Sequence, residues 1–463
     1  MSEKKYLYGA AVQGIQSFIF QTNKMKEIIG ASELVEQICT EAFDEFEVNG
    51  ERVIKAAGNI KFVFNNEEDC AKAVREFPRK VMSMAPGITF SQAVVTLADD
   101  YETKRNELEQ KLHEARNRQM ISQNIGLMGI MRSRQTGLPM IADSDDKDAG
   151  TLKKIECSKL AKKKLNYKIF RDKYNVEQPL PTIEHITGQN DWIAVVHVDG
   201  NGLGDIFRSF GSDIQNLRAF SQSLSEATIK SAQEAVRAVA TSDVVPIVPI
   251  VIGGDDLTVI IRASISVDFV RAYLKSFEAH TLELCGAKLS ACGGIAFIKS
   301  SYPFYYGYEL AETLCGKAKN KSGRKHSCLM FHKVQDSFIK DFEDIKEREL
   351  TPAPGMTFLY GPYYLEGSAG KPSIDELIAD VKALNKDEQG SAAKSHLRQW
   401  LTLMHKSDNV ALQRLDRVMS QTSSFEYKNI IKRATESRLV GDEKAYEAYD
   451  MLSLSSVIYQ KTK

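Results

Sequence analysis

The sequence predicts an α+β protein in which a β-α-β-β-α-β unit occurs twice and is followed by a helical region. Three observations support this class. Short apolar runs of strand length alternate with longer segments of helical periodicity, turn-forming glycine and aspartate separate paired runs, and only helical periodicity remains from about residue 373 onward. The chain has 463 residues, of which 43% are hydrophobic and 26% charged, so more than one domain is expected.

The second of the two units has the clearer pattern. The expected elements are a strand at 192–199, a helix over 203–240, a hairpin of 244–252 and 257–263, a helix near 267–284, a strand at 288–298 and a helix over 303–320. This is the ferredoxin-like order, in which the central hairpin lies beside the first strand. The strand that ends at Asp199 should therefore lie next to the hairpin turn.

The N-terminal region repeats this order more faintly. The expected elements are a strand at 5–12, helices within 14–46, a hairpin of 52–57 and 60–64, a helix near 67–83 and a strand near 88–98. The turn at Gly58-Asn59 occupies the place that Gly-Gly-Asp-Asp holds in the second unit. We infer an internal duplication in which the first copy lacks the acidic pair.

The remaining segments link and extend these units. A charged helix is expected at 101–118, and the basic run 151–174 is interpreted as a solvated helical face, with nucleic-acid contact as the alternative. The C-terminal helices are expected at 374–384, 390–405, 408–421 and 441–455, after a Pro- and Gly-rich linker at 351–372. The predicted domains are a first unit at 1–98, a mixed linker at 99–190, a second unit at 191–350 and a helical region at 351–463.

Composition excludes several classes of function. The 61 basic and 61 acidic residues balance, so no overall attraction to nucleic acid is indicated. The seven cysteines form no Cys-x-x-Cys pair, which favours reduced thiols over a zinc site. No apolar run approaches the roughly 20 residues of a membrane span, and the N-terminus has no signal-peptide pattern. We therefore expect a cytoplasmic protein without membrane contact.

Two short motifs carry the candidate chemistry: Val-Asp-Gly-Asn-Gly-Leu-Gly at 198–204 and Gly-Gly-Asp-Asp at 253–256. Asp199 should end a strand beside the turn that carries Asp255 and Asp256. Mg²⁺ prefers oxygen ligands and usually takes one or two carboxylates plus substrate phosphates. Gly-Gly-Asp-Asp alone would also suit an ordinary polar turn. Together with Asp199, the motif predicts that these three aspartates form a catalytic metal site for a nucleoside triphosphate.

Glycines after Asp199 suit phosphate binding, because they let backbone amides approach phosphate oxygens at the start of a helix. A turn that needs positive φ would use the same residues. Lys317 lies near the end of the last helix, where a cation is favourable with or without a phosphate. His197 shares a strand face with Asp199 and is interpreted as a core histidine. The second-unit residues expected to contact nucleotide are Gly200, Asn201, Gly202, Leu203, Gly204, Gly253, Gly254 and Lys317.

These segments together resemble the large polymerase/cyclase subunit of type III CRISPR effector complexes, which carries two palm domains and a Gly-Gly-Asp-Asp motif in the second. This resemblance spans about residues 1–330. The second palm is also similar, more distantly, to GGDEF-type diguanylate cyclases. It rests on residues 16–35, which are similar to the family's first palm, and on 198–204, 252–257 and 302–312 with the following Lys317 and Lys319, which are similar to its second.

The resemblance implies two ferredoxin-like palms, a small C-terminal helical domain and synthesis of cyclic oligonucleotide messengers in antiviral defence, most often cyclic oligoadenylate from ATP. Asp199 and Asp255 would hold Mg²⁺ or Mn²⁺, with the Gly200 carbonyl as an extra ligand and Asp256 as a ligand or an aid to the attacking 3′-hydroxyl. The first palm would hold the acceptor nucleotide. Its expected lining residues are Ser32, Gly58 and Asn59.

Two departures from the family pattern limit what the resemblance implies. Many relatives begin with a His-Asp nuclease domain, and this sequence contains no His-Asp dipeptide, so single-stranded DNase activity is not expected. Many relatives also carry a zinc ribbon between the palms, where residues 99–190 hold only Cys157. Partners are expected to be nucleoside triphosphates and, for a complex subunit, CRISPR effector subunits with guide and target RNA. Assembly of the chain into a homo-oligomer is left as an open alternative.

Two other functions are weighed. A catalytically silent palm could serve as a nucleotide- or RNA-binding scaffold of a CRISPR ribonucleoprotein, although an idle site has no need of three carboxylates. A template-directed polymerase finds no support, since no thumb or primer-grip segment is evident.

Overall fold

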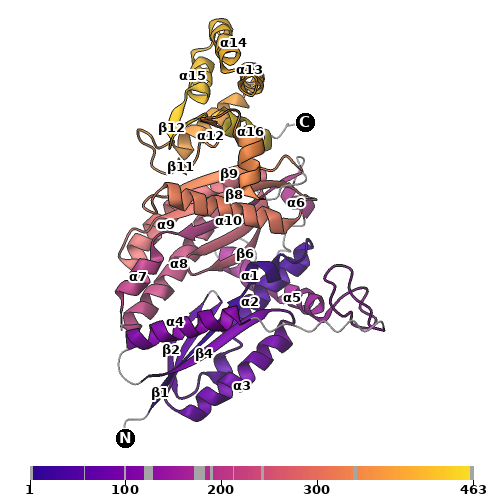
Figure 1. Ribbon diagram of the computed structural model, residues 1–463, viewed down its shortest axis with the longest axis vertical. Coiled ribbons are helices and arrows are strands. Elements are labelled where there is room, and N and C mark those ends of the chain that lie inside the picture. Colours follow the sequence, from indigo (N-terminus) through magenta and orange to yellow (C-terminus); the bar gives the residue numbers. More distant parts are fainter. Residues whose placement is uncertain are drawn as a thin grey trace.

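The computed structural model describes residues 4–56, 58–97, 101–118, 129–170, 183–187, 191–211, 213–240, 245–336 and 341–458. The molecule is elongated (Figure 1): the N-terminal palm lies at one end, the second palm in the middle and the C-terminal helices at the other end. This arrangement confirms the predicted α+β class with two palms and a helical C-terminal region. None of the helices in these ranges has the length and apolar character that crossing a bilayer requires.

The first palm has a four-stranded antiparallel sheet in the order β2-β3-β1-β4. Its strands are β1 (Lys5–Gln13), β2 (Gly50–Ala56), β3 (Asn59–Phe64) and β4 (Thr89–Leu97). Its helices are α1 (Ile15–Ile19), α2 (Met25–Thr40), α3 (Glu67–Met84) and α4 (Tyr101–Asn117), with a 3₁₀ turn η1 at Asp44–Phe46. Alternate residues of β1 face opposite sides: Tyr8 stacks on Phe43, whereas Leu7 packs with Leu108 and Leu112 of α4.

The second palm repeats that order and extends it to β11-β9-β8-β5-β7-β6. Its strands are β5 (Trp192–Gly200), β6 (Ile247–Gly253), β7 (Asp256–Arg262), β8 (Ala291–Lys299), β9 (Cys328–Lys333) and β11 (Tyr363–Tyr364). Its helices are α7 (Leu203–Ser209), α8 (Ile214–Val239), α9 (Ala263–Cys285) and α10 (Phe304–Lys321). Gly293 of β8 lies against Val270 of α9, and Gly294 lies against Ala311 of α10, so α9 and α10 cover opposite faces.

One prediction for the second palm was wrong. The single helix expected over 203–240 is broken into α7 and α8, because Gly211 has a φ of +51° and Asp213 starts a new helix by accepting a hydrogen bond from the Asn216 amide at 3.0 Å. Helical periodicity continues across the break, which is why the pattern alone missed it.

The segment between the palms packs on the first palm. α5 (Ala149–Phe170) lies across α2, and α6 (Ile183–Thr187) precedes β5. Lys154, in the run interpreted as a solvated face, is only 3% exposed, and its ammonium donates to the Phe18 carbonyl at 2.7 Å. That part of the interpretation was wrong, because α5 covers α2 instead of facing water. The predicted domain boundaries themselves stay a prediction.

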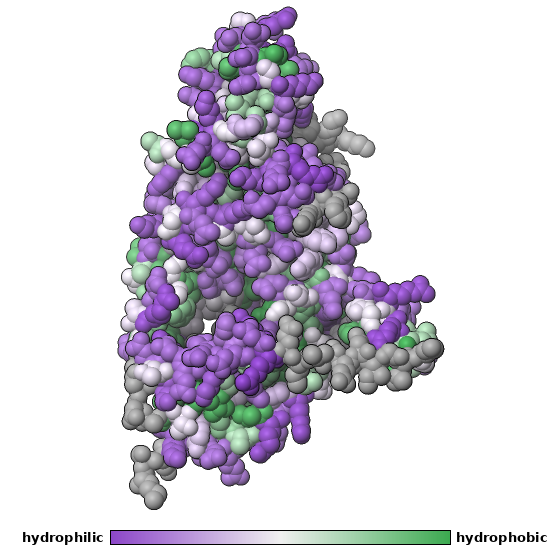
Figure 2. Space-filling model, in the orientation of Figure 1, coloured by the Kyte–Doolittle hydropathy of each residue, from purple (hydrophilic) through white to green (hydrophobic). Residues whose placement is uncertain are grey.

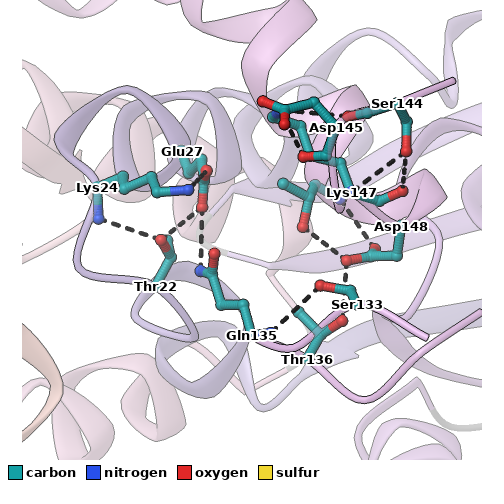
Figure 3. Close-up of polar contacts among 11 residues, drawn as sticks. Thr22, Lys24, Glu27, Ser133, Gln135, Thr136, Ser144, Asp145, Lys147 and Asp148 are labelled. Atoms are coloured by element: carbon teal, nitrogen blue, oxygen red, sulfur yellow. Dashed lines mark hydrogen bonds and ion pairs between the residues drawn. The ribbon is translucent and has the colours of Figure 1, made fainter. Parts of the chain in front are cut away.

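A polar cluster fastens the preceding loop to the start of α2 (Figure 3). The Gln135 amide donates to buried Glu27 at 3.2 Å, and Thr136 donates to Asp148 at 3.0 Å. Asp148 also accepts from the Thr151 amide at 3.0 Å in the first turn of α5. These bonds tie the start of α2 and the first turn of α5 to the loop, and α2 reaches the second palm.

The two palms share contacts through α1, α2 and the residues between them. Ser32 of α2 donates a hydrogen bond to the Ile250 carbonyl of β6. Phe20 stacks on Tyr308 of α10 with ring centroids 4.8 Å apart. The Asn23 side chain accepts from the Phe304 amide at 3.1 Å, which satisfies a free N–H at the start of α10. The hairpin of the first palm is thereby held close to the hairpin of the second.

The C-terminal region is helical with a small sheet (Figure 1). Its helices are α11 (Phe342–Ile345), the π-helical turn η2 (Lys346–Leu350), α12 (Ile374–Leu384), α13 (Glu388–Met404), α14 (Asp408–Gln421), α15 (Phe425–Thr435) and α16 (Ala448–Ile458). β10 (Met356–Thr357), β12 (Arg438–Val440) and β13 (Glu443–Ala445) form its sheet. The helix expected over 441–455 was therefore wrong in its first part: Gly441, with a φ of +62°, turns a hairpin there, and α16 begins at Ala448.

Candidate active site

Three aspartates meet where β5 ends and the β6–β7 hairpin turns. Val198 pairs with Leu257, and continuing this register by one residue sets Asp199 opposite Asp256. Gly253 pairs with Asp256, so Gly254 and Asp255 form a two-residue turn, in which Gly254 adopts a φ of +62°. Asp255 hydrogen-bonds with Asp199. The structure thus brings together the three residues for which the sequence predicted a shared site.

The carboxylates of the hairpin turn are poorly solvated. Burial, together with the neighbouring charges of Asp256 and Asp199, raises the pKa of Asp255 to about 8. Burial also raises the pKa of Asp256 to about 7, with repulsion from Asp199 adding to it and attraction from Lys319 opposing it. Near neutral pH the metal-free site therefore retains protons, because three carboxylates this close cannot all ionise without a compensating cation.

Lys319 of α10 supplies the cation that the structure places at the site. The residue is 7% exposed, and its ammonium pairs with Asp199 and donates to the Gly200 carbonyl at 2.7 Å. Lys317, which the sequence offered either as a phosphate contact or as a cation at a helix end, has other partners. It pairs with Glu343 at 2.7 Å and lies over the Phe342 ring. A two-residue step turns a helix by about 200°, so only one of the two lysines can face the sheet.

The loop after Asp199 has separate tasks for its residues. A Cβ on Gly200 would lie 2.6 Å from Leu203 and 3.0 Å from Asp255, so a side chain there would have to displace one of these neighbours. Gly202 has a φ of +70° and starts α7, while Gly204 and Gly253 face open space. Asn201 turns inward: its side-chain amide donates to Ser290 at 3.0 Å. Asn201 thus fixes the loop to β8 and directs its side chain away from the aspartates.

Two further residues support the hairpin turn and the strand end: Thr228, which sequence reasoning missed, and His197, which it interpreted as a core histidine. Thr228 of α8 donates to the Gly254 carbonyl at 2.7 Å and so anchors the turn from behind. His197 lies on β5 two residues before Asp199, and its Nδ1 lies 3.1 Å from Thr258 Oγ1. Burial lowers the pKa of His197 to about 4, so the ring is neutral at pH 7. Its place on the Asp199 face was visible in the sequence, whereas nothing there pointed to Thr228.

Two cavities flank the acidic turn, and both are lined by residues of the first palm. The larger, of about 510 Å³, has Asn59 on one side and Gly254 and Asp255 on the other. In Figure 2 the surface is hollowed at this level, above α4. The smaller, of about 90 Å³, is lined by Ser32 and Gly58 together with Asp256. All three predicted first-palm residues therefore line a cavity that an aspartate of the second palm also lines.

The residues present suit a divalent cation. One ligand atom from each of His197, Asp199 and Asp256 lies within 4.8 Å of the other two. The three carboxylates carry three negative charges when ionised, and Lys319 together with one divalent ion would balance them. The raised pKa values of Asp255 and Asp256 reflect the same excess of negative charge, because without a metal ion it is protons that neutralise the carboxylates.

Comparison with known proteins agrees with this geometry. Residues 192–328 match the family model described as Cas10/Cmr2, second palm domain. Over these residues the second palm is similar to that family. The matched residues run from β5 to the first residue of β9 and so contain all three aspartates and Lys319. Among curated proteins, no sequence matched this chain.

Solved structures extend the likeness beyond residues 192–328. A Csm1–Csm4 cassette in complex with cA4 matches with a TM-score of 0.61 at 13% identity, covering 99% of this chain and 69% of that chain. The cassette in complex with AMPPNP matches with a TM-score of 0.61 at 12% identity and the same coverage. The Csm1–Csm4 subcomplex of the type III-A CRISPR-Csm interference complex gives 0.60 at 13%, covering 99% and 70%. At this identity the match establishes a shared fold along the whole chain.

Proposed function

We propose that the chain is a metal-dependent nucleotidyl cyclase that joins nucleoside triphosphates, with ATP favoured, into cyclic oligonucleotides. The expected product class is cyclic oligoadenylate, and the expected setting is antiviral defence in the cytoplasm as a type III CRISPR effector subunit. One observation carries the proposal. The acidic turn of the second palm lines a cavity of about 510 Å³ whose other wall is the first palm, and that volume suits a nucleotide-sized ligand.

The proposed reaction needs two nucleotides in one site. The 3′-oxygen of one attacks the α-phosphorus of the other, a new P–O bond forms, the bond to pyrophosphate breaks, and the hydroxyl proton passes to water. The step is repeated, and the ring closes when the 3′-hydroxyl of the linear oligonucleotide attacks the α-phosphorus of its own 5′-triphosphate and releases pyrophosphate. Asp199, Asp256 and the Gly200 carbonyl would hold Mg²⁺ or Mn²⁺, and Asp255 is a further candidate ligand. When bound, the ion neutralises charge on the reacting phosphates.

The residues around the larger cavity suit the polyanionic substrate. Lys61, Arg105 and Arg208 line it together with Asp255. Arg105 donates to the Gly211 carbonyl at 3.5 Å, and the other two pair with exposed carboxylates. These partners are weakly held at the surface, so a triphosphate can take their place at modest cost.

The ligands of the similar solved structures support the substrate class. Csm1–Csm4 cassettes have been solved in complex with ATP, pppApA, cA3 and cA4. A nucleotide, a linear intermediate and cyclic products on one fold are what a stepwise cyclase requires. We accordingly propose a Csm4-like subunit and guide and target RNA as partners of this chain.

The test uses the full chain with ATP and either Mg²⁺ or Mn²⁺. Pyrophosphate release and mass spectrometry of the product are measured for the wild type and for the double variant Asp255→Ala/Asp256→Ala. Asp416→Ala is the matched control, because Asp416 is an exposed acid on α14 in the C-terminal helical region. We expect a cyclic product from the wild type and the control, and none from the double variant.

Two outcomes contradict the proposal. Unchanged turnover in the double variant would show that the product comes from another site. ATP binding by the wild type without any product, with and without target RNA and partner subunits, would favour the silent scaffold instead.

A further inference from the structure

His197 lies at the metal site without a role in the proposed cyclase. It is 7% exposed, stands on the same face of β5 as Asp199, and lines the smaller cavity together with Asp256. One of its ring nitrogens belongs to the group of ligand atoms, with oxygens of Asp199 and Asp256, that lie within 4.8 Å of one another. Two donors on opposite sides of one ion lie about 4 Å apart, so a contraction of less than about 1 Å would close the set.

The surroundings of His197 orient its ring. Nδ1 lies 3.1 Å from the Thr258 hydroxyl on the paired strand β7, and Tyr308 of α10 meets the ring edge-on with centroids 5.6 Å apart. Donation from Nδ1–H to Thr258 leaves the lone pair on Nε2. Metal-binding histidines commonly donate their other ring N–H to a neighbouring acceptor, which fixes the tautomer.

We propose that His197 is a protein ligand of the metal ion at this site, together with Asp199 and Asp256. A set of one imidazole and two carboxylates favours first-row transition-metal ions over Mg²⁺, because imidazole is a good ligand for the former and Mg²⁺ prefers oxygen. The ion that fills this site is therefore Mn²⁺ or another transition-metal dication in preference to Mg²⁺. The inference rests on the proposed function only in taking the site to hold a divalent ion.

The alternative is a histidine that only fills the core. The register of the sheet argues against it. The first palm has Gly9 at the place of His197 and Lys61 at the place of Thr258, and the space over Gly9 is filled by Leu108 of α4. An apolar side chain thus suffices to close this position where no acidic site lies beside it. In the second palm a hydrogen-bonded imidazole stands there instead, next to a cavity.

Metal binding to the full chain without nucleotide is the direct test. Affinities for Co²⁺, Mn²⁺ and Mg²⁺ are measured by isothermal titration, and visible absorption of bound Co²⁺ reports its ligands. His197→Gln replaces the nitrogen donor by an amide of similar size. We expect it to weaken Co²⁺ and Mn²⁺ binding by at least about 10-fold, to change Mg²⁺ binding by less than about 3-fold and to shift the Co²⁺ absorption bands. His332→Gln is the control, since His332 is a buried histidine on β9 beside Glu349.

A second variant keeps the test decisive if His197→Gln does not fold. Thr258→Val retains the imidazole and removes its hydrogen-bond partner, and we expect an affinity loss of about 10-fold for Co²⁺. Equal losses for Co²⁺ and Mg²⁺, or an unchanged Co²⁺ spectrum in both variants, would overturn the inference. Failure of the cyclase is a separate result: a wild type that makes no product but binds Co²⁺ through His197 keeps this inference and loses the proposed function.

Discussion

The two palms share one strand order and differ at the few positions that carry chemistry. In the first palm Ala11 pairs with Asn59, and the equivalent register in the second sets Asp199 opposite Asp256. Gly58 stands where the second palm has Asp255. Both first strands also run into a left-handed glycine that starts a short helix, Gly14 before α1 and Gly202 before α7. A common scaffold is therefore compatible with one acidic and one neutral turn.

The helix that follows the fourth strand widens this difference. In the first palm α4 places Leu108 and Leu112 on β1, which makes an apolar cover. In the second palm α10 places Tyr308 beside His197 and Lys319 beside Asp199. The helix at this place in the fold thus covers the sheet of the first palm with leucine, whereas in the second palm it brings a charged lysine to the sheet. Four predictions sharpen or break this contrast.

The largest effect is expected from giving the second palm the residue of the first. Asp199→Ala installs the equivalent of Ala11, removes a proposed metal ligand and should slow pyrophosphate release from ATP by at least about 100-fold. Asn59→Ala, in the first palm, should cost about 10-fold or less, because it only lines the cavity. Equal losses for the two variants would show that the neutral turn of the first palm contributes as much to the reaction as the acidic site of the second.

Lys319 of α10 should contribute more to stability than Lys317 on the same helix. Lys319→Met leaves Asp199 and the Gly200 carbonyl without their buried ammonium and should destabilise the metal-free protein by about 2 kcal/mol. Lys317→Met removes only a surface pair and should change stability by less than about 1 kcal/mol. Urea unfolding in the presence of a chelator measures both. The reverse order would place Lys317, as the sequence suggested, at the site.

Gly200 offers a test of how tightly the loop is built. Gly200→Ala pushes a methyl group against Leu203 and Asp255 and should lower turnover by about 10-fold through a displaced carboxylate. Gly204→Ala meets nothing within 4 Å and should leave turnover unchanged. Turnover of ATP under identical conditions compares them. Unchanged turnover in Gly200→Ala would mean that the loop can move to make room for the methyl group, like an ordinary strand-to-helix turn.

The smallest effect concerns pH. The folded pKa of Asp255 is about 8 against an ordinary value of 3.8, so the folded metal-free protein retains a proton that the unfolded chain loses. Its stability is therefore greatest at low pH and falls as pH rises towards 8. We expect the melting temperature without metal to drop by on the order of 2 °C between pH 6 and pH 8.5, and saturating divalent metal to restore it more at pH 8.5 than at pH 6.

Two variants separate this slope from general effects of pH. Asp255→Asn should flatten it, because the amide does not titrate, while Asn59→Ala in the neutral turn of the first palm should leave it unchanged. A slope that survives Asp255→Asn would assign the titration to another buried acid, such as Asp450 or Glu447.

The sequence predicted what depends on local pattern. Apolar runs located the strands of both palms, and the two-residue turns followed from glycine and aspartate between paired runs. The meeting of Asp199 with Asp255 and Asp256 followed from strand order. Helix breaks did not follow, because periodicity continues from α7 into α8 and from the β12–β13 hairpin into α16.

By itself, then, the sequence determined the duplicated scaffold and the acidic turn, since both arise from spacing along the chain. Only the tertiary structure decided which lysine faces the site, because that depends on how α10 is rotated against β5 and β8. The burial of Lys154 against Phe18 of α1 and the approach of His197 to Asp256 were decided in the same way, by contacts between segments far apart in sequence. Packing of one element on another sets these features, and no periodicity within a single element records it.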